Sequence, residues 1–413
     1  MTKPLNYPIE FIRSQFPALA DGFVFFDNAG GSQTLQPVVD RISEYLLTSD
    51  VQLGASYAVS QKAAERVAEA NQKMAMYVGT DDPGEVVIGA SATAQFRMLA
   101  RCLALTWQAG DEVIITNTEH EANASPWVEL EARGMVVKQW KVNPESLCLE
   151  TADLEPLLTP RTRLVTFTHV SNVLGTINPV KEITDFVHQR GALIAVDGVA
   201  YAPHRALEVQ QWGVDFYIFS CYKVYGPHQG VLYGKRHLLE ALPSYNHYFI
   251  ASNDLPYKFQ PGGVNYELSY GLIGVNDYLG EVARRAEAPE TTEKAAITTA
   301  FDLMAQHEAQ LGQRLLAFLE AHPKTQVIGR ADAHPNHRVA TYSFTVAGWQ
   351  SDAVVAQVDP HRIGIRYGDF YAKKLIAALG LESQNGVVRV SMVHYNTLEE
   401  VDRLIEVLEP ILG

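Results

Sequence analysis

Cysteine, long apolar runs and basic charge are all scarce in this sequence. Its three cysteines, Cys102, Cys148 and Cys221, are an odd number without CxxC spacing, which argues against a disulfide framework and a structural zinc site. No stretch approaches about 18 uninterrupted apolar residues, so no membrane-spanning helix is expected. The opening residues 1–8 contain no apolar segment of the kind found in signal peptides. A cytoplasmic protein is the expectation.

Acidic residues outnumber basic ones, 47 to 33, and give a formal net charge of −14. Nucleic acids and anionic membranes both require a basic face, so neither is expected as the main partner. A small anionic ligand remains compatible with this balance, because a binding site can be locally positive. The 413 residues exceed one typical hydrophobic core, which predicts more than one domain.

Short apolar runs alternate with helical patterns over the first two thirds of the chain. This alternation predicts an α/β fold in which helices cover a mostly parallel sheet. We assign residues 20–280 to this large domain. The predicted strands are 24–26, 86–88, 113–116, 136–142, 164–168, 193–197, 216–220 and 231–233, and the clearest helices are 61–77 and 179–190.

After residue 280 the pattern changes to one long helical stretch, 278–322, followed by mixed strands and helices. It predicts a smaller α+β domain of residues 281–413. The N-terminal segment 1–19, with Phe11 and Phe16 as anchors, is expected to pack on this domain. The further strands are 339–346, 363–367 and 387–392, and the further helices are 351–358, 371–379 and 398–412.

Lys223 and Asp197 each follow an apolar, β-prone run. An amine that condenses with an aldehyde and a carboxylate that holds a pyridinium proton are the pair that pyridoxal phosphate requires. Both lie at predicted strand ends, where ligands bind in open α/β sheets. Taken singly, Lys223 is also compatible with a surface residue, and Asp197 with the first residue of a turn at Gly198.

Two further segments suit the ring and the phosphate of this cofactor. His120 follows the predicted strand 113–116 and offers a flat group that can stack on a pyridine ring. Metal binding by the Glu-His-Glu triplet is the rival, but adjacent loop residues seldom converge on one ion and no HExxH spacing is present. The segment 89–95, with Ala92 and Thr93, lies where a helix N-terminus favours an anion. A helix cap without a ligand is the alternative.

Arg389 lies in the segment 387–391, between residues that are predicted to be buried. An arginine in such a place needs an anionic partner, and its guanidinium binds a carboxylate with two hydrogen bonds. It is therefore a candidate for the carboxylate of an amino-acid substrate. A structural salt bridge is the alternative.

Taken together, these segments resemble class V aminotransferases, specifically the branch of cysteine desulfurases and selenocysteine lyases. The resemblance extends over nearly the whole chain. It implies a fold-type I homodimer, with a mostly parallel seven-stranded sheet in the large domain and active sites at the subunit interface. The segments that carry it are 26–30, 119–123, 171–176, 196–198, 216–227, 389–391 and 395–397.

The resemblance also implies roles for individual residues. Lys223 would bind the cofactor covalently, Asp197 would pair with the ring nitrogen, and His120 would stack on the ring and act in catalysis. The other implied cofactor-binding residues are Asn172 near the ring hydroxyl, Ala92, Thr93, Ser220 and Tyr222 at the phosphate, and Gly263 in the loop 260–265 that reaches the neighbouring subunit. The implied substrate-binding residues are Arg389, Asn28 and Tyr371.

This chain departs from the branch at four positions. Ala200 stands where glutamine is frequent, Tyr222 replaces the usual histidine, and Gly263 replaces a phosphate-binding threonine. Tyr371 occupies the place of the cysteine that forms a persulfide, and no cysteine follows Cys221. Cys221 itself lies on a predicted strand and is expected in the core, so sulfur transfer through an enzyme persulfide is not expected.

These observations predict a pyridoxal phosphate enzyme that acts on a small, sulfur-containing amino acid by β-elimination, as a C–S lyase does. Aminotransfer, epimerisation and desulfuration with sulfide release remain alternatives with the same cofactor. A protein that binds the cofactor without catalysis is the alternative from a different class.

Overall fold

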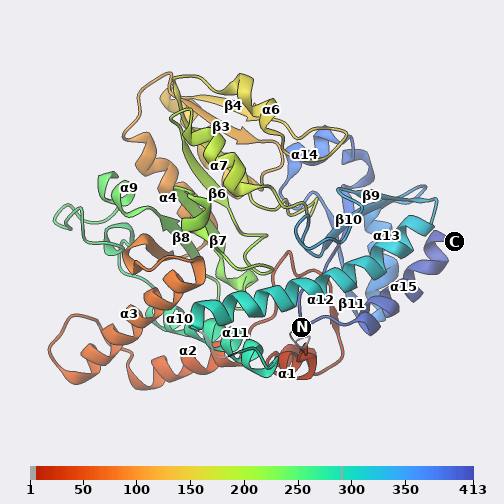
Figure 1. Cartoon of the computed structure of the whole chain (residues 1–413), viewed down its shortest axis with the longest axis horizontal. Coiled ribbons are helices and arrows are strands. Elements are labelled where there is room, and N and C mark those ends of the chain that lie inside the picture. The colour runs from red at the N-terminus through yellow and green to blue at the C-terminus, as the bar shows by residue number, and fades with distance from the viewer. Residues whose placement is uncertain (1–5, 290–291) are drawn as a thin grey trace.

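The computed structural model describes residues 6–289 and 292–413 and divides into a large and a small domain (Figure 1). The large domain contains a sheet of seven strands, and the small domain an antiparallel sheet of four. These sheets confirm the predicted fold class. In spatial order the seven strands are β2 (Val86–Gly89), β8 (Gly230–Gly234), β7 (Phe216–Ser220), β6 (Leu193–Asp197), β5 (Thr162–Thr168), β3 (Glu112–Thr116) and β4 (Val136–Trp140).

Strand direction in the large sheet determines where the polar residues after the strands gather. Strands β3 to β7 run parallel to one another, and β8 runs antiparallel to both β7 and β2. The carboxyl ends of parallel strands lie at one edge of a sheet, and this is where ligands bind in open α/β folds. Thr168, Asp197 and Ser220 end β5, β6 and β7 at this edge.

Both faces of the large sheet are buried. Neighbouring residues on a strand point to opposite faces, so each strand contributes to two cores. On β7, Tyr217 and Phe219 belong to one core, whereas Phe216 and Ile218 belong to the other. The first core includes side chains of α3 (Ala58–Val78), α7 (Val180–His188), α8 (Val209–Trp212) and α11 (Ile273–Arg285). The second includes side chains of α4 (Ala92–Ala104), α5 (Glu121–Val128) and α9 (Arg236–Ala241).

The small domain has a core of its own behind its antiparallel sheet. Its strands are β12 (Arg366–Gly368), β13 (Val387–Ser391), β10 (Thr341–Val346) and β9 (Thr325–Ile328), in spatial order. Its helices are α13 (Ser351–Val358), α14 (Lys373–Ala378) and α15 (Leu398–Leu412). The remaining helices are α1 (Ile9–Ser14), α2 (Gln36–Thr48), α6 (Thr151–Leu154), α10 (Tyr266–Gly271) and α12 (Glu293–Ala321).

Two predictions from the sequence are wrong in detail. The run 24–26 was expected among the strands of the large sheet, but β1 (Val24–Phe25) pairs in parallel with β11 (Ile363–Gly364). Within this run, the side chains of Val24 and Phe26 lie in the core of the small domain. The long helix expected at 278–322 is divided into α11 and α12. Pro289 lies between them and lacks the N–H that a continuous helix would need, while residues 290–291 lie outside the described part.

The N-terminal segment lies where the two domains meet, so it packs on both and not on the small domain alone. The ring of Phe16 contacts Tyr225 and Tyr278 of the large domain and Tyr395 of the small one. Residues 1–5 of this segment fall outside the described part. In Figure 1, α12 crosses from the large domain to the small one, with Phe301 in the first core of the large domain and Leu315 in the core of the small domain.

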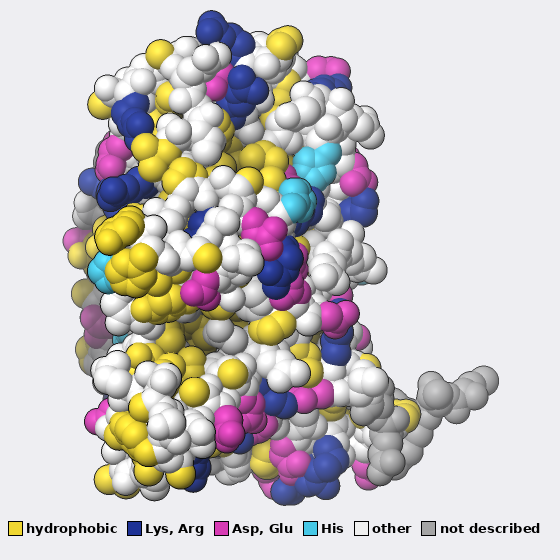
Figure 2. All heavy atoms as spheres, turned by 90° about the vertical axis from the view of Figure 1, so that its left-hand side faces the viewer, with side chains coloured by type: hydrophobic (Ala, Val, Ile, Leu, Met, Phe, Trp, Pro, Cys, Tyr) yellow, Lys and Arg dark blue, Asp and Glu magenta, His cyan; other side chains and the backbone are white. Residues whose placement is uncertain are grey.

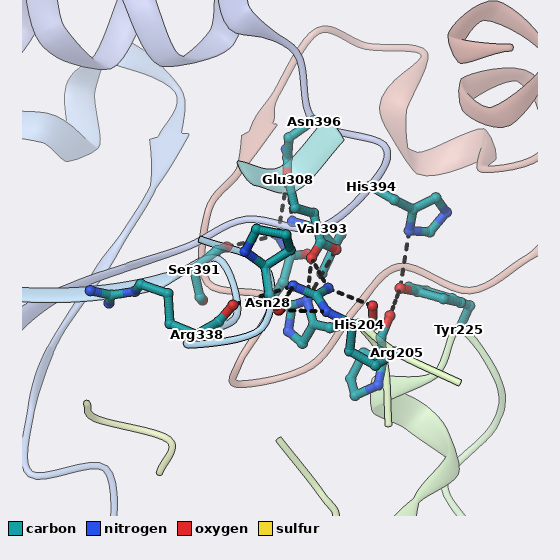
Figure 3. Close-up of polar contacts among 12 residues, drawn as sticks. Asn28, His204, Arg205, Tyr225, Glu308, Arg338, Ser391, Val393, His394 and Asn396 are labelled. Carbon is teal, nitrogen blue, oxygen red and sulfur yellow. Dashed lines mark hydrogen bonds and ion pairs between the residues drawn. The ribbon is translucent and has the colours of Figure 1, made fainter. Parts of the chain in front are cut away.

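Buried polar contacts join the domains beside α12 (Figure 3). His204 Nδ1 lies 3.0 Å from both carboxylate oxygens of Glu308, and Arg205 Nη1 lies 3.1 Å from one of them. His394 Nδ1 lies 3.0 Å from the hydroxyl of Tyr225. These contacts fix the small domain against the strand edge. Among the described helices, none is long and apolar enough to cross a membrane.

Candidate active site

A cavity opens at the carboxyl edge of the large sheet. Its lining contains residues from the ends of β5, β6 and β7 and from the start of α4. The structure thus brings together the residues that the sequence predicted for a cofactor, with the exception of Gly263. The lining residues are Ala92, Thr93, His120, Ala122, Thr168, Val170, Asn172, Asp197, Val199, Ala200, Ser220, Tyr222 and Lys223.

Lys223 is buried and belongs to a short 3-10 helix, Cys221–Lys223, that directly follows β7. Burial disfavours the charged ammonium and, with a smaller contribution from Arg389, lowers the pKa of Lys223 to about 8. Asp197 and Asp27 act in the opposite direction. A substantial fraction of the amine is therefore uncharged and nucleophilic near neutral pH.

Asp197 ends β6 and is also buried. Burial raises the pKa of Asp197 to about 6, although a hydrogen bond from the Val199 N–H and the charge of Lys223 lower it. The N–H donates to Oδ1 over 2.9 Å. Because this pKa is still below 7, the carboxyl is mostly ionised at neutral pH and can hold a proton on a basic nitrogen in the cavity.

His120 caps the N-terminus of α5, and this contact fixes its tautomer. The backbone N–H of Ala122 donates to Nδ1 over 3.0 Å, so Nδ1 carries no proton and Nε2 carries it in the neutral ring. Burial, with a smaller contribution from the charge of Lys223, lowers the pKa of His120 to about 4. The imidazole is therefore a neutral, oriented ring on the wall of the cavity.

Glu119 holds the loop that carries His120. It accepts hydrogen bonds from the Thr116 hydroxyl over 2.5 Å, the Asn123 amide over 2.6 Å and the Thr168 N–H over 2.9 Å. Burial raises the pKa of Glu119 to about 8. These contacts join β3, α5 and the end of β5, so they set the position of His120 relative to Asp197.

The N-terminus of α4 forms the opposite end of the cavity. Ser91 caps this helix by accepting a hydrogen bond from the Ala94 N–H, and the next residues, Ala92 and Thr93, line the cavity. A Cβ on Gly230 would lie 2.3 Å from the Ala92 nitrogen, so glycine is required for β8 to approach this turn. Free N–H groups at the start of a helix favour an anion such as a phosphate.

A second cavity adjoins the first at Lys223. Arg389 lies on its wall, with Nη2 2.7 Å from Asp27 Oδ1 and Nη1 3.1 Å from the carbonyl oxygen of Asn172. Its guanidinium stacks 3.7 Å from the ring centre of Phe370. The lining residues are Ala29, Gly30, His120, Asn172, Tyr222, Lys223, Arg366, Phe370, Tyr371 and Arg389.

The loop after β12 closes this second cavity with a strained backbone. Phe370 and Tyr371 both have positive φ angles, 52° and 61°, which side-chain-bearing residues seldom adopt. Two contacts hold them there: Asn172 Nδ2 donates to the Phe370 carbonyl over 2.9 Å, and the Glu121 N–H donates to the Tyr371 carbonyl over 2.9 Å. The Tyr371 ring lies 5.2 Å from that of His120.

Two of the predicted residues lie away from both cavity linings. The side chain of Asn28 donates to the Ser391 carbonyl over 2.9 Å and to Asn396 Oδ1 over 3.2 Å (Figure 3), so it is occupied in the domain junction. Gly263 lies on a turn with a φ of +89°. No role was predicted from the sequence for Asp27, Phe370 or Arg366. Asp27 lies within the segment 26–30 that carries the resemblance, and Arg366 and Phe370 lie close to Tyr371 in the sequence; these positions were their only signal.

The polar and charged groups that line the two cavities fit pyridoxal phosphate and an amino acid. The first offers a buried amine, a carboxylate, a flat neutral ring and a helix N-terminus, which match the aldehyde, ring nitrogen, ring face and phosphate of the cofactor. The second offers a buried arginine for a carboxylate. Nε of Arg389 is buried and has no hydrogen-bond partner among the described residues, so the guanidinium retains an unused donor.

Comparison with known families agrees with this geometry. Residues 24–404 match the family described as aminotransferase class-V. The chain belongs to this family. Its members generally use pyridoxal phosphate. Within the class V aminotransferases it is similar to the cysteine desulfurase-like branch, which confirms the family resemblance seen in the sequence.

Three similar proteins show how far this likeness extends. Aminotransferase-like protein FGM3 of Gibberella zeae is 44% identical, and the match covers 98% of this chain and 99% of that protein. Cysteine desulfurase-like protein ustD of Aspergillus flavus is 35% identical over 98% of this chain and 90% of that protein. The crystal structure of the cysteine desulfurase CsdA from Escherichia coli superposes with a TM-score of 0.84 at 26% identity, covering 98% of this chain and 99% of that one.

Proposed function

We propose that this class V aminotransferase-like chain is a pyridoxal phosphate-dependent lyase that acts on a small, sulfur-containing amino acid by β-elimination. The observation that carries the proposal is the buried amine of Lys223 at the junction of the two cavities. One cavity has Asp197 and the start of α4, and the other has Arg389. An amine with a lowered pKa between a cofactor-shaped and a substrate-shaped cavity is what this chemistry requires.

The residues that would hold the cofactor follow from the donor set. Lys223 would attach it, Asp197 would keep its ring nitrogen protonated, His120 would cover the ring face, and Thr93 and Ser220 would bind the phosphate. When bound, the cofactor supplies an electron sink for negative charge at the substrate α-carbon. Ala92, Asn172 and Tyr222 complete this set, and Gly263 would reach the site of the partner subunit.

The chain's own residues then act on the substrate. Arg389 binds the α-carboxylate, and the Phe370 ring against its guanidinium limits how far it can turn. The Lys223 amine, released when the substrate amine takes its place, removes the proton from the α-carbon as a general base. The bond from the β-carbon to its leaving group breaks, and the leaving group departs with the electron pair.

Tyr371 is the residue that we assign to protonate the leaving group. It lies on the wall of the second cavity, 63% of its surface is exposed, and a phenol can donate a proton. No cysteine follows Cys221 in the chain, and burial raises the pKa of Cys221 far above its ordinary value. A thiol in that state is a poor nucleophile, which favours elimination over transfer through an enzyme persulfide.

The products formed from cysteine test this proposal. With purified protein and the cofactor, we expect pyruvate and sulfide in equal amounts and no alanine. Pyruvate, alanine and sulfide are measured separately in the same reaction. Alanine, with sulfide appearing only when a thiol reductant is added, would indicate desulfuration and contradict elimination. A keto acid without sulfide would indicate aminotransfer. No product with any of cysteine, cystine and selenocysteine would favour a protein that binds the cofactor without catalysis.

The pH dependence of cofactor attachment tests the role of Lys223 separately from turnover. Only the uncharged amine reacts with an aldehyde, and its pKa is about 8. We expect the attachment rate of the apoprotein to rise with pH and to level off above about 8. In Arg389→Gln the midpoint should move to higher pH, because the neighbouring cation that disfavours the ammonium is gone. Stopped-flow absorbance on mixing with pyridoxal phosphate measures both, and a pH-independent rate would contradict the assignment.

We also propose that the protein acts as a homodimer. Apolar side chains are exposed on the face where α2, α3 and the loop after α9 lie (Figure 2). They include Leu47 of α2 and Tyr248 and Phe249 of the loop, with 84%, 98% and 68% of their surfaces exposed. A second copy of the chain would cover these side chains. This arrangement also gives the loop that contains Gly263 a route to the neighbouring active site.

A further inference from the structure

Two arginines face each other across the small sheet beside the second cavity. Arg366 on β12 and Arg389 on β13 are directly paired residues of antiparallel strands. Side chains of such a pair project from the same face with their Cβ atoms about 4.5–5.5 Å apart. Like charges in this arrangement are destabilising. The two arginines therefore lower the stability of the sheet, and the fold does not require arginine at both positions.

Asp27 provides part of the compensation. Its Oδ1 lies 2.7 Å from Arg389 Nη2, and its Oδ2 lies 3.6 Å from Arg366 Nη1. One carboxylate is thus shared between two guanidinium groups. The described lining of the second cavity contains Lys223, Arg366 and Arg389 but neither aspartate nor glutamate. The cavity therefore carries a surplus of positive charge in an otherwise acidic protein.

One substrate carboxylate does not use up this charge. In the proposed function Arg389, buried at the inner wall, binds the α-carboxylate. Arg366 lies on the same cavity, but 57% of its side chain is exposed and its contact with Asp27 is the longer of the two. Its guanidinium is therefore free to reorient toward a second anion beside the first. An amino acid with a neutral side chain would leave this donor unmatched.

We propose that Arg366 determines substrate specificity by binding an anionic group on the substrate side chain. The substrate class is then a small amino acid with a negatively charged sulfur group on its β-carbon, such as a sulfonate, which departs as sulfite with the electron pair. This inference rests on the proposed function, because it takes Arg389 as the site of the α-carboxylate. Arg366 positions the side chain, and the proton transfers remain with Lys223.

Succinate and its monoamide, succinamate, test the proposal with the cofactor-loaded protein. The two have nearly the same shape and neither has an amine, but only succinate has two carboxylates. Isothermal titration should show succinate binding about tenfold more tightly, because only succinate has a second carboxylate that can form a charged hydrogen bond with the partly exposed Arg366. In Arg366→Gln the preference should disappear, with the affinity for succinamate unchanged.

Two control variants sharpen this experiment. Arg389→Gln should weaken both ligands, because it removes the shared carboxylate site. Arg314→Gln on α12, which breaks an exposed ion pair with Asp402 on α15, should change neither. Equal binding of the two ligands to the wild type, or an equal loss of both in Arg366→Gln, would overturn the role of Arg366.

The titration also separates failure of this inference from failure of the proposed function. Neither ligand reacts, so the preference for succinate is readable even if no amino acid is turned over. Loss of the preference together with pyruvate production from cysteine would reject the second anion and leave the lyase intact. A clear preference for succinate without turnover of either cysteine or its sulfonate, cysteate, would support the anion site and reject the lyase.

Discussion

Lys223→Ala is expected to abolish covalent attachment of pyridoxal phosphate and to lower turnover by about 10³-fold or more. The variant loses both the attachment point and the base that takes the α-proton, and general base catalysis alone contributes about 10²- to 10⁴-fold. Borohydride reduction followed by mass spectrometry of tryptic peptides measures the attachment. In the wild type, the added mass should lie on the peptide that contains Lys223.

Two further variants make this result specific. Lys223→Arg keeps a positive charge but cannot form the covalent bond, so it should fail in the same way. Lys181→Ala removes an exposed lysine paired with Asp185 on α7 and should behave as the wild type. Covalent cofactor on Lys223→Ala after reduction and dialysis would show that the attachment point is another lysine.

Asp197→Asn is expected to retain the covalent cofactor but to lower turnover by about 10²- to 10³-fold. Asparagine has the same shape as aspartate but cannot hold a proton on the ring nitrogen by its charge, and losing one electrostatic group of this kind costs about that much in other enzymes. The comparison is made on the turnover number at saturating substrate. Asp185→Asn, an exposed carboxylate on α7, is the matched control.

The same variant should change the titration of Lys223. Asp197 raises the pKa of the amine by stabilising its charged form, so removing this charge should move the midpoint of cofactor attachment below about 8. The direction is opposite to that expected for Arg389→Gln. An unchanged midpoint together with full turnover would mean that Asp197 belongs only to the turn that follows β6.

The strands of the large sheet could be predicted because each is a short buried run that is recognisable locally. The positions of Asp197 and Lys223 at strand ends followed from the same runs. Strand β1 could not be placed in this way, because its partner β11 lies in the last quarter of the chain. The division between α11 and α12 did have a local signal, Pro289, which the long helical pattern obscured.

The residues of the candidate active site also fall into those with a local signal in the sequence and those whose role depends on contacts between distant segments. His120, Thr93 and Ser220 could be predicted from their place after a strand or at a helix start. The functions of Asp27 and Phe370 depend on their contacts with Arg389, and those contacts exist only after the small domain closes on the large one. Asn172 shows the limit of the resemblance, because its amide donates to the Phe370 carbonyl in this structure.

The pairing of β1 with β11 has a consequence for how the protein matures on the ribosome. Val24 leaves the exit tunnel early, but its partner Ile363 is 339 residues behind it. At about 5–20 residues per second, this interval lasts roughly 20–70 seconds. Throughout that time Val24 and Phe26 lack the core that finally covers them. The nascent chain thus exposes apolar side chains near its N-terminus that can associate with other chains. A chaperone that binds roughly the first thirty residues should therefore raise the yield of active protein.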